Sequence, residues 1–475
     1  MRRGLPSLLQ SRRRSSVDPV PVPRRRQMQT LIDAVASEPT GPSPPVDPRW
    51  VLVNHWIVPR DSANVVADDK TAAECRPSCS RPLRISLGAA APPAISFLCL
   101  DLAGDRRARS EDDEFTDKHV PVTAAHGDSV LLRRRRQLPS EHRNVCIIKQ
   151  YRPRYDYFVY RAAATGRPPS LSLLPGCCIP VVERDYQGYI GDDDDFTGRN
   201  FDHCDTGILR RSDDELLVAQ LRVANDAPFD TAQLCVLHPG RLEWELNTAV
   251  PIVHTNGGRG HDLQMWQEAH VAVPVGDRFL CWVNFDCSTF LLCDMATRDP
   301  KLHYVPLPVK AMPPKDDEDY EDCYDEQPPW LYYRRIGAAG PDAVRFVSID
   351  NRCCCGAHVI WSSCEHSSSA FMVTMWTLAL STSEPMRWVK EAVLDCEEVW
   401  SLATSKGLPR VRLTSPVVSM ENPDVVCFMA SMGDLLWTVD IDLRKKTLIS
   451  ATPCPAHPVE CVNYANPLPA KLHSP

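Results

Sequence analysis

The stretch CWVNFDCSTFLLCDM, residues 281–295, decides how the rest of the chain is interpreted. Its two apolar runs are joined by a short polar segment, which is the pattern of two β-strands and a turn. Alternation along these strands places Trp282, and then Leu291 and Cys293, on one packed face. Asp294 stands where a short side chain accepts backbone N–H groups and fixes the following turn. We therefore expect the cysteines to pack and the aspartate to have a structural role.

The same pattern continues in both directions. Short apolar or alternating runs, each bounded by Gly, Pro, Asp or Asn, extend from RWVLVNHWIV at residue 49 to TLIS at residue 450. The 43 prolines against 21 glycines favour many loops and short elements over long helices. The best candidate for a short helix is EAVLDCEEVWSLA, residues 391–403. The composition and patterning predict an all-β protein.

A weak internal repeat narrows the fold class. Each copy is an apolar strand, a polar turn and a second strand, and the copies recur at roughly 55 to 85 residues. They are YFVYRAAATGRPPSLSLLP (157–175), LCVLHPGRLEWELN (234–247), LLCDMATRDPKLHYVPLP (291–308), MWTLALSTSEPMRWVKEAVL (375–394) and LWTVDIDLRKKTLIS (436–450). Small sheets that bury their faces against one another around a centre satisfy this pattern. We predict a β-propeller-like array of short antiparallel sheets with irregular insertions; the alternative is two β-sandwich or barrel domains dividing near residue 200.

The composition of the ends divides the chain into three parts. Residues 1–48 are rich in Arg, Ser and Pro and are predicted to be a disordered tail, residues 49–450 the β body, and residues 451–475 a proline-rich C-terminal tail. The arginines near the start resemble a transit peptide or a nuclear localisation patch, and a basic tail without an address is the alternative. The nucleus, the cytoplasm and an organelle all stay open as the compartment.

Charge and cysteine content exclude several classes of protein. A net charge of -8 gives no overall basic field for nucleic acid, so binding through the basic N-terminal tail is a minor alternative. The 20 cysteines are diluted over 475 residues and follow no secretion signal, which predicts a reducing, intracellular environment. The chain contains no apolar run long enough to span a membrane, so we expect a soluble protein without a membrane partner.

One motif raises the possibility of hydrolase chemistry. HGDSVLL, residues 126–132, contains Gly-Asp-Ser, and Ser129 is the candidate nucleophile. Such a serine needs a strand-turn-helix setting and a histidine base, whereas Ser129 leads into a strand-like run that ends in four arginines. The histidine that would act as its base is one of His126, His254, His261 and His270. A serine hydrolase is therefore the alternative to a non-enzymatic protein.

A second motif raises the possibility of a metal site. CCCGAHVIWSSCEH, residues 353–366, offers Cys355, His358, Cys364 and His366, but tetrahedral zinc prefers two closely spaced pairs. We expect these cysteines to be free and predict no metal or cofactor. Four further segments have structural interpretations. The acidic runs 192–195 and 316–319 are expected to be solvated insertions, the basic run 133–136 an exposed strand end or loop, and the Gly-rich segment 255–262 a flexible hairpin loop.

An ordered series of segments resembles a known family. RWVLVNHWIV, HGDSVLL, GILRRSDDELLVAQL, AQLCVLHPGRLEWEL, VAVPVGDRFLCWVNF, LLCDM and LHYVPLP resemble the plant family built on domain of unknown function 1618, which is numerous in grasses. The resemblance runs from about residue 50 to about 449, with a family-specific segment at about 271–400, and implies a propeller-type β fold without a particular activity. The turn NFDCSTF departs from the family by lacking the Arg-Gly that usually opens the second strand, so it loses a favoured glycine.

These observations favour a binding function over a catalytic one. No complete catalytic, cofactor or metal constellation is recognisable in the sequence, and rigid β scaffolds carry binding sites on their loops. We predict a non-enzymatic scaffold that binds a protein or peptide partner through loops such as the acidic segment from Pro313 to Pro329.

Overall fold

The structure is a computed structural model of the 475-residue chain. It separates residues 1–46 from a compact unit of residues 47–475, and every described residue lies in the second unit. The described residues are 49–60, 67–76, 82–92, 94–101, 120–135, 155–177, 201, 204–223, 230–254, 263, 265–266, 268–310, 332–352, 370–404, 408, 410–432, 435–454 and 468–472.

Most described strands form groups of four consecutive antiparallel strands, which we call blades 2 to 6 in chain order; blades 3 and 4 together make one eight-stranded sheet. Val, Leu, Phe and Trp dominate them, as expected for buried strands. Blade 2 contains β6 (Val122–His126), β7 (Ser129–Arg135), β8 (Tyr155–Arg161) and β9 (Ser170–Leu173); blade 3 contains β10 (Thr206–Arg210), β11 (Leu216–Val223), β12 (Thr231–Leu237) and β13 (Glu245–His254); blade 4 contains β14 (Val271–Val275), β15 (Phe279–Asn284), β16 (Thr289–Asp294) and β17 (Leu302–Pro306). Blade 5 contains β18 (Arg334–Ala338), β19 (Ala343–Asn351), β20 (Phe371–Ala379) and β21 (Val389–Asp395); blade 6 contains β22 (Leu413–Val418), β23 (Val425–Met432), β24 (Leu435–Asp442) and β25 (Thr447–Cys454).

Blade 1 is assembled from both ends of the compact unit. Its strands β1 (Val51–Val53), β3 (Asp68–Cys75), β4 (Leu83–Gly88) and β5 (Ile95–Asp101) are joined by the C-terminal β26 (Leu468–Ala470) in the order β26-β1-β5-β4-β3, while the two-residue β2 (Val58–Pro59) pairs with β5. β26 pairs antiparallel with β1, so that Val51 lies opposite Ala470.

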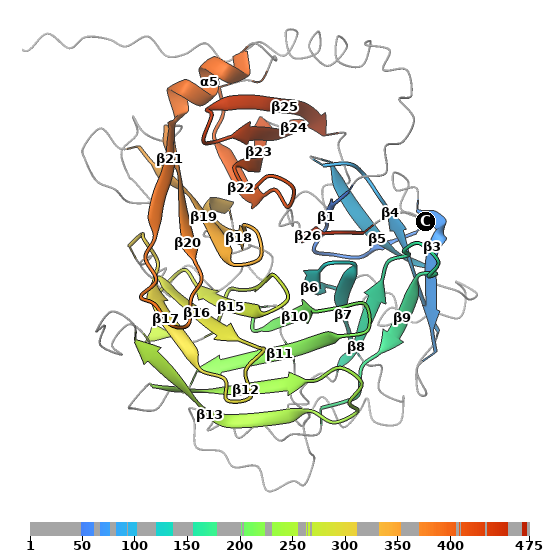
Figure 1. The fold of residues 1–475 in the computed structure, drawn as a ribbon. Coiled ribbons are helices and arrows are strands. Elements are labelled where there is room, and N and C mark those ends of the chain that lie inside the picture. Colours follow the sequence, from blue (N-terminus) through green and yellow to red (C-terminus); the bar gives the residue numbers. More distant parts are fainter. Residues whose placement is uncertain are drawn as a thin grey trace, which may run out of the picture. The chain divides into compact units, whose positions relative to one another are not determined.

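The innermost strands of the six blades form a closed series. β26 lies beside β6, followed in order by β10, β14, β18 and β22, and β22 lies beside β26 again (Figure 1). Blades 3 and 4 are also joined at their outer edges, where β13 pairs in parallel with β17. The predicted all-β, propeller-like array is thus confirmed, with six blades among the described strands.

A separate apolar core fills each interface between neighbouring blades. Leu132 and Phe158 of blade 2 pack with blade 1, whereas Leu131 and Val159, on the opposite face of the same strands, pack with blade 3. Similar cores join blades 3 and 4, 4 and 5, and 5 and 6. The core between blades 6 and 1 is the smallest and is built on Trp50, Leu52, Val417 and Cys427. Because strand alternation buries both faces of a sheet, no blade is stable without its neighbours.

The five sequence repeats correspond to equivalent parts of the fold. Each falls on the third and fourth strands of a blade, from β8–β9 in blade 2 to β24–β25 in blade 6. The alternative with two domains dividing near residue 200 is wrong, because blades 2 and 3 share one core across that position.

Two predicted boundaries differ from the structure. The C-terminal tail predicted from residue 451 instead contains the end of β25 and all of β26. Pro469 has no N–H, but β26 is an edge strand of its sheet, where a missing donor is tolerated.

The helix predicted at residues 391–403 is displaced. Residues up to Asp395 belong to β21, and α5 spans Cys396–Thr404. Asp395 accepts the Glu397 N–H at 3.0 Å, and Glu398 accepts the Asp395 N–H at 3.0 Å, which is a reciprocal helix cap. The cap fixes the start of the helix, although the periodic pattern begins earlier.

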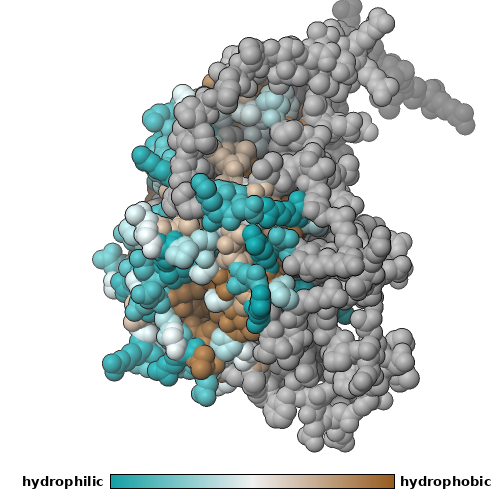
Figure 2. Space-filling view, turned by 90° about the vertical axis from the view of Figure 1, so that its right-hand side faces the viewer, coloured by the Kyte–Doolittle hydropathy of each residue, from teal (hydrophilic) through white to brown (hydrophobic). Residues whose placement is uncertain are grey.

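The surface alternates between hydrophilic and hydrophobic areas. Figure 2 shows one side of the molecule, on which a hydrophobic patch lies among mainly hydrophilic residues. Exposed large apolar side chains of the described residues are spread over several blades and include Leu173, Leu242, Met265, Val389 and Ile449. Single exposed apolar residues are normal on soluble proteins, so they do not identify a site by themselves.

Candidate functional site

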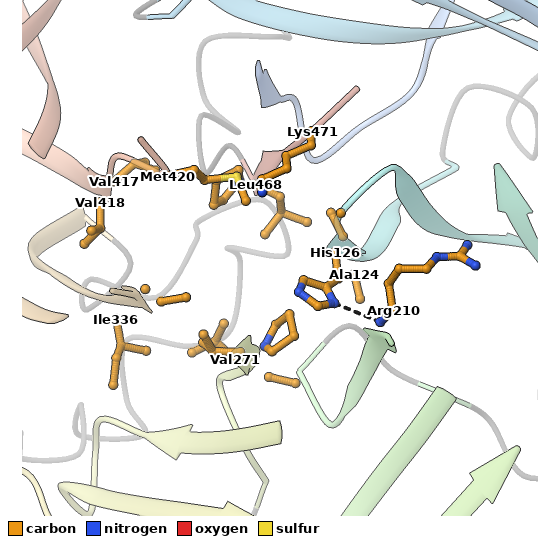
Figure 3. Close-up of a pocket in the computed structure, with 18 of the residues that line it drawn as sticks. Ala124, His126, Arg210, Val271, Ile336, Val417, Val418, Met420, Leu468 and Lys471 are labelled. Atoms are coloured by element: carbon orange, nitrogen blue, oxygen red, sulfur yellow. Dashed lines mark hydrogen bonds between the residues drawn. The ribbon is translucent and has the colours of Figure 1, made fainter. Parts of the chain in front are cut away.

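The innermost strands of the blades enclose a cavity of about 530 Å³, which we call the central cavity. Residues from β6, β14, β18, β22 and β26 line it, so every part of the ring except the blade 3 strand contributes several side chains. Its volume lies in the range of small-molecule and peptide-anchor sites. Figure 3 shows these side chains converging from different blades.

The cavity walls are mainly small or apolar. Ala124, Val271, Ile336, Val418 and Leu468 are among the residues whose side chains form them (Figure 3). Blades 5 and 6 approach closely here, because a Cβ added at Gly337 would lie 3.0 Å from the Cβ of Val418. Glycine at this position therefore sets the spacing between two innermost strands.

His126, at the end of β6, directs a hydrogen-bond donor into the cavity. Its Nδ1 accepts the backbone N–H of Arg210 at 2.8 Å. Burial, together with the nearby charges of Lys471 and Arg210, lowers the pKa of His126 to about 4, so the imidazole is neutral at pH 7. Since Nδ1 is an acceptor, the proton of the neutral ring is on Nε2. The second ring nitrogen faces the cavity (Figure 3).

His270 also lines the cavity but is held by its own blade. Its Nδ1 accepts the Phe285 N–H at 3.0 Å, and its Nε2 lies 3.3 Å from the carboxylate of Asp286. The side chain is 8% exposed. His270 therefore fixes the β15–β16 turn to the innermost strand of blade 4.

Lys471 and Asp277 place opposite charges at the edge of the cavity. Both residues are exposed and line it, and the Lys471 N–H donates to the Gly127 carbonyl at 2.8 Å. Within the described part of the chain, no carboxylate lies within ion-pair distance of the Lys471 ammonium. The backbone contact thus holds Lys471 beside the His126 hairpin while its side chain remains available.

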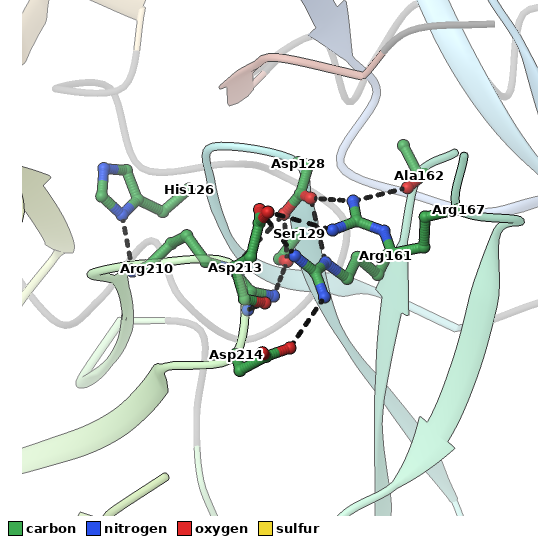
Figure 4. Close-up of polar contacts among 9 residues, drawn as sticks. All are labelled: His126, Asp128, Ser129, Arg161, Ala162, Arg167, Arg210, Asp213 and Asp214. Carbon is green, nitrogen blue, oxygen red and sulfur yellow. Dashed lines mark hydrogen bonds and ion pairs between the residues drawn. The ribbon is translucent and has the colours of Figure 1, made fainter. Parts of the chain in front are cut away.

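Beside the cavity, Asp128 is the centre of an arginine cluster. Arg161 donates to its carboxylate at 3.0 Å, Arg210 lies 3.3 Å away, and Arg167 makes a further ion pair (Figure 4). Burial alone raises the pKa of Asp128, but hydrogen bonds from Arg161 and Ser129 and the nearby arginine charges outweigh it and lower the pKa below its usual value. The carboxylate is therefore charged and joins blades 2 and 3.

The structure places Ser129 in this cluster. Its hydroxyl is fully buried, donates to Asp128 at 2.9 Å and accepts a hydrogen bond from Arg210. None of the described histidines hydrogen-bonds to Ser129. The acceptor of its proton is the Asp128 carboxylate, which is engaged by Arg161 and Arg210 and has a lowered pKa, so it is a weak general base.

None of the described candidate histidines hydrogen-bonds to Ser129, although His126 lies directly opposite it in the β6–β7 hairpin. His126 is engaged with the Arg210 N–H as described above, and the ring of His254, in β13, packs against Tyr304 with a centroid distance of 4.9 Å. His270 belongs to blade 4, and His261 lies outside the described residues. The sequence thus identified His126 and His270 as candidate residues, and the structure places both in the lining of the central cavity.

The cysteines of the opening stretch are packing residues. Cys281 and Cys293 are fully buried, and burial raises the pKa of both thiols. Cys293 packs with Trp282 and Leu291, as alternation predicted, whereas Cys281 faces the next interface. Among the described residues no His, Cys, Asp and Glu side chains group as metal ligands, and Cys355, His358, Cys364 and His366 lie outside those residues.

The arginine run is more structured than the sequence suggested. Arg133–Arg135 continue β7, and Arg134 is only 5% exposed, so the predicted exposed strand end is wrong for this residue. Arg133 stacks over the Tyr155 ring at 4.7 Å. The acidic runs, the segment 255–262, the loop from Pro313 to Pro329 and the N-terminal arginines lie outside the described residues.

A match to a family model covers the strands on one side of the cavity. Residues 282–427, from β15 in blade 4 to β23 in blade 6, match the model described as "Protein of unknown function (DUF1618)". Residues 282–427 are similar to the DUF1618 family. This confirms the expected resemblance over these residues, which include the walls contributed by Ile336 and Val418. No curated protein matches the chain.

Solved structures of low similarity cover most of the chain. A family 25 polysaccharide lyase described as an ulvan lyase has a TM-score of 0.33 at 7% identity, with 86% of this chain and 87% of that chain covered. The periplasmic gluconolactonase of Pseudomonas aeruginosa has a TM-score of 0.29 at 10% identity, with 84% and 96% covered. A protein of unknown function from Desulfotomaculum acetoxidans has a TM-score of 0.31 at 9% identity, with 86% and 89% covered. At these scores the likenesses carry no argument about the role of the DUF1618 segment or its neighbours.

The nine-residue helix α5 is shorter than a membrane-spanning helix. Within the described residues, the structure contains no helix that is both long and apolar enough to cross a bilayer.

Proposed function

We propose that the chain is a non-enzymatic interaction scaffold, and that a protein or peptide partner binds it at the central cavity. The observation that carries the proposal is the convergence of innermost strands from different blades on one apolar cavity. Apolar walls provide the burial that drives association, and a few polar groups at the edge provide orientation.

The contacts of the polar side chains support binding over catalysis. Ser129 and Asp128 are engaged in the cluster that joins blades 2 and 3, and His270 is engaged in a turn. Groups committed to such contacts stabilise the scaffold. The Asp128 carboxylate beside Ser129 has a lowered pKa and is therefore a weak base, whereas an activated nucleophile needs a stronger one. A serine hydrolase therefore remains the less favoured alternative, and nucleic-acid binding by the N-terminal arginines concerns residues outside the described ones.

The segment from Pro313 to Pro329 is a second region of the proposed scaffold that would contact the partner. The sequence predicted a protein or peptide partner at this loop, and the acidic composition of the loop suits a basic partner surface.

Cavity filling tests the proposal. Met420, which lines the cavity, is replaced by Trp, and Met265, which is 63% exposed and does not line it, is replaced by Trp as the matched control. Partners captured from extract by the native chain are identified by mass spectrometry and compared with those captured by each variant and by a chain lacking residues 313–329. We expect Met420→Trp to lose the reproducible partner and Met265→Trp to keep it. Recovery of the same partner with Met420→Trp, in a variant that keeps its thermal midpoint, would contradict the proposal.

A further inference from the structure

Three features of the cavity are placed to contact a ligand. They are the Nε2–H of His126, the ammonium of Lys471 and the apolar wall formed by blades 4, 5 and 6, whose residues Ile336 and Val418 also belong to the cores between blades. The arginine cluster, by contrast, consists of groups that satisfy one another, and the exposed apolar side chains show no occupant. The cavity edge therefore carries polar groups that no contact within the described part of the chain engages.

The imidazole of His126 is oriented before any ligand arrives. The Arg210 N–H fixes Nδ1, which leaves the Nε2–H pointing to the cavity (Figure 3). No described residue accepts a hydrogen bond from this group. A donor with a fixed direction and a neutral ring loses little freedom when it binds an acceptor, so it favours a ligand that presents an oxygen.

Lys471 adds a positive charge next to this donor. The backbone contact between Lys471 and Gly127 holds it beside the hairpin that carries His126, and its charge is near enough to influence that imidazole. Arg210 also lines the cavity, but its guanidinium is directed to Asp128 and Ser129. The available charge near His126 is therefore that of Lys471, with the carboxylate of Asp277 also at the edge.

The opposite wall selects for an apolar group. Val271, Ile336, Val418 and Met420 lie across the cavity from His126 and come from blades 4, 5 and 6 (Figure 3). The ammonium of Lys471 and the N–H donor of His126 suit an anionic oxygen, and the apolar side chains of the lining suit hydrocarbon.

We propose that the central cavity binds a carboxylate that is attached to an apolar group, with the Lys471 ammonium and the His126 Nε2–H holding the carboxylate. This deepens the proposed function and rests on the cavity being the binding site. The carboxylate has two possible sources, the C-terminus of a partner peptide or a free organic acid, and both present the same chemistry to the two donors.

Calorimetric titration of the full chain with defined probes tests this assignment. The probes are octanoate against octanamide for the free acid, and N-acetyl-Ala-Leu-Val with a free C-terminus against its amidated form for the peptide. We expect the carboxylate of at least one pair to bind about tenfold more tightly than its amide, because charge-assisted hydrogen bonds are the stronger ones. Preference for the octanoate or the peptide identifies the source.

Matched lysine variants assign the effect to the cavity. Lys471→Met should weaken binding of the carboxylate by about tenfold and leave the amide unchanged. Lys471→Arg should retain most of the binding, and Lys301→Met, which removes an exposed lysine outside the cavity, should leave it unchanged. Thermal midpoints equal to that of the native chain exclude unfolding as the cause.

The outcomes separate this inference from the proposed function. Equal binding of carboxylate and amide, an unchanged affinity in Lys471→Met, or the absence of binding by all four probes at millimolar concentration would overturn the carboxylate assignment. If the carboxylates bind through Lys471 but Met420→Trp still captures the same partner, the scaffold proposal fails and the carboxylate site stands. If Met420→Trp loses the partner and the probes do not bind, the carboxylate assignment fails and the scaffold proposal stands.

Discussion

Asp294 illustrates how a buried charge is supported in this fold. Its side chain is 4% exposed, and it accepts hydrogen bonds from Arg278 at 2.9 and 2.5 Å and from the Ala296 N–H at 3.0 Å. Burial alone raises the pKa of Asp294, but the Arg278 and Ala296 hydrogen bonds outweigh it and lower the pKa. The carboxylate therefore stabilises the β16–β17 turn as an anion.

Neutralising Asp294 should destabilise the chain. Asp294→Asn keeps the shape but loses the charge-assisted bonds to Arg278, so we expect the free energy of unfolding to fall by about 1 to 3 kcal/mol. Denaturant titration at pH 7 measures this, with the exposed Asp299→Asn as the control. Because the folded pKa of Asp294 is lowered, its contribution is present above the usual value of 3.8 and is lost as the pH falls below it. Equal stability of the two variants would contradict this role.

His126 should make stability depend on pH in a different range. Its unfolded pKa is about 6.5 and its folded pKa about 4, so the unfolded state binds more protons between these values and stability falls as the pH is lowered. We expect a loss of about 2 kcal/mol between pH 7 and pH 5 that is absent in His126→Gln. Denaturant titrations at both pH values measure it, and His238→Gln, at a histidine whose side chain is 40% exposed, should behave as the native chain. The same pH dependence in His126→Gln would refute the assignment.

At the residue scale, the sequence predicted roles that depend on near neighbours. Asp294 was expected to accept backbone N–H groups, and alternation placed Trp282, Leu291 and Cys293 together. Arg278 was missed as the partner of Asp294, because their pairing depends on the register in which β15 meets β16. Lys471 was missed because it follows a three-residue strand that contains proline and carries no strand pattern.

At the scale of single elements, the β15–β16 hairpin shows the cost of a missing glycine. Ser288 adopts φ +53°, a left-handed conformation that favours glycine, and the Asn284 side chain accepts the Cys287 N–H at 2.9 Å within the same turn. The sequence had identified this turn as lacking its favoured glycine. Hydrogen bonding by Asn284 compensates for part of the strain.

Substitutions at Ser288 should therefore act in opposite directions. We expect Ser288→Gly to raise the free energy of unfolding by up to about 1 kcal/mol, because it relieves the left-handed strain, and Ser288→Val to lower it by at least that amount. Thermal and denaturant unfolding of the two variants provide the measurement. A destabilised Ser288→Gly chain would show that the serine side chain contributes more than its backbone costs.

A second turn fixes the spacing between two blades. Gly276, in the β14–β15 turn, has φ +58°, and a Cβ there would lie 2.5 Å from the Pro341 carbonyl oxygen in the β18–β19 turn. Gly276→Ala should lower the free energy of unfolding by more than Gly240→Ala, because both positions have positive φ but only the first has a neighbour within 4 Å. We expect the difference to be about 1 kcal/mol or more by denaturant titration. An equal fall in the free energy of unfolding for Gly276→Ala and Gly240→Ala would contradict a close approach of blades 4 and 5 at Gly276.

At the element scale, pattern and spacing predicted most of the strands. The repeats identified the outer hairpins of blades 2 to 6, because a turn between two apolar runs is a local signal. The start of α5 was displaced by five residues, since the capping pair of Asp395 and Glu398 overrides the apparent periodicity. The parallel pairing of β13 with β17 joins strands nearly fifty residues apart, and nothing local in the sequence signals it.

At the scale of the whole molecule, closure of the ring depends on the C-terminal strand. β26 pairs with β1 over three residues and lies beside β6, and the core between blades 6 and 1 is the smallest of the six. Sequence patterning predicted that sheets bury their faces around a centre, but it assigned residues 451–475 to a tail. A three-residue edge strand is too short to show a periodic pattern in the sequence, and β26 is defined by its pairing with β1.

The cavity depends on the same closure. Leu468 and Lys471 bring the C-terminal segment to the cavity edge, beside the hairpin that carries His126. Loss of β26 would therefore remove both a wall and the proposed carboxylate-binding cation. The C-terminal strand β26 is therefore required both for closing the ring of blades and for the proposed carboxylate site.

Hydrogen exchange measured by mass spectrometry tests closure most directly, in a chain that ends at residue 472 and in one that ends at residue 467. We predict that the shorter chain loses amide protection in β1 and at the end of β6, while β20 in blade 5 keeps the protection of the longer chain. Unchanged protection of β1 in the shorter chain would contradict a ring closed by the C-terminal strand, and with it the account of the central cavity.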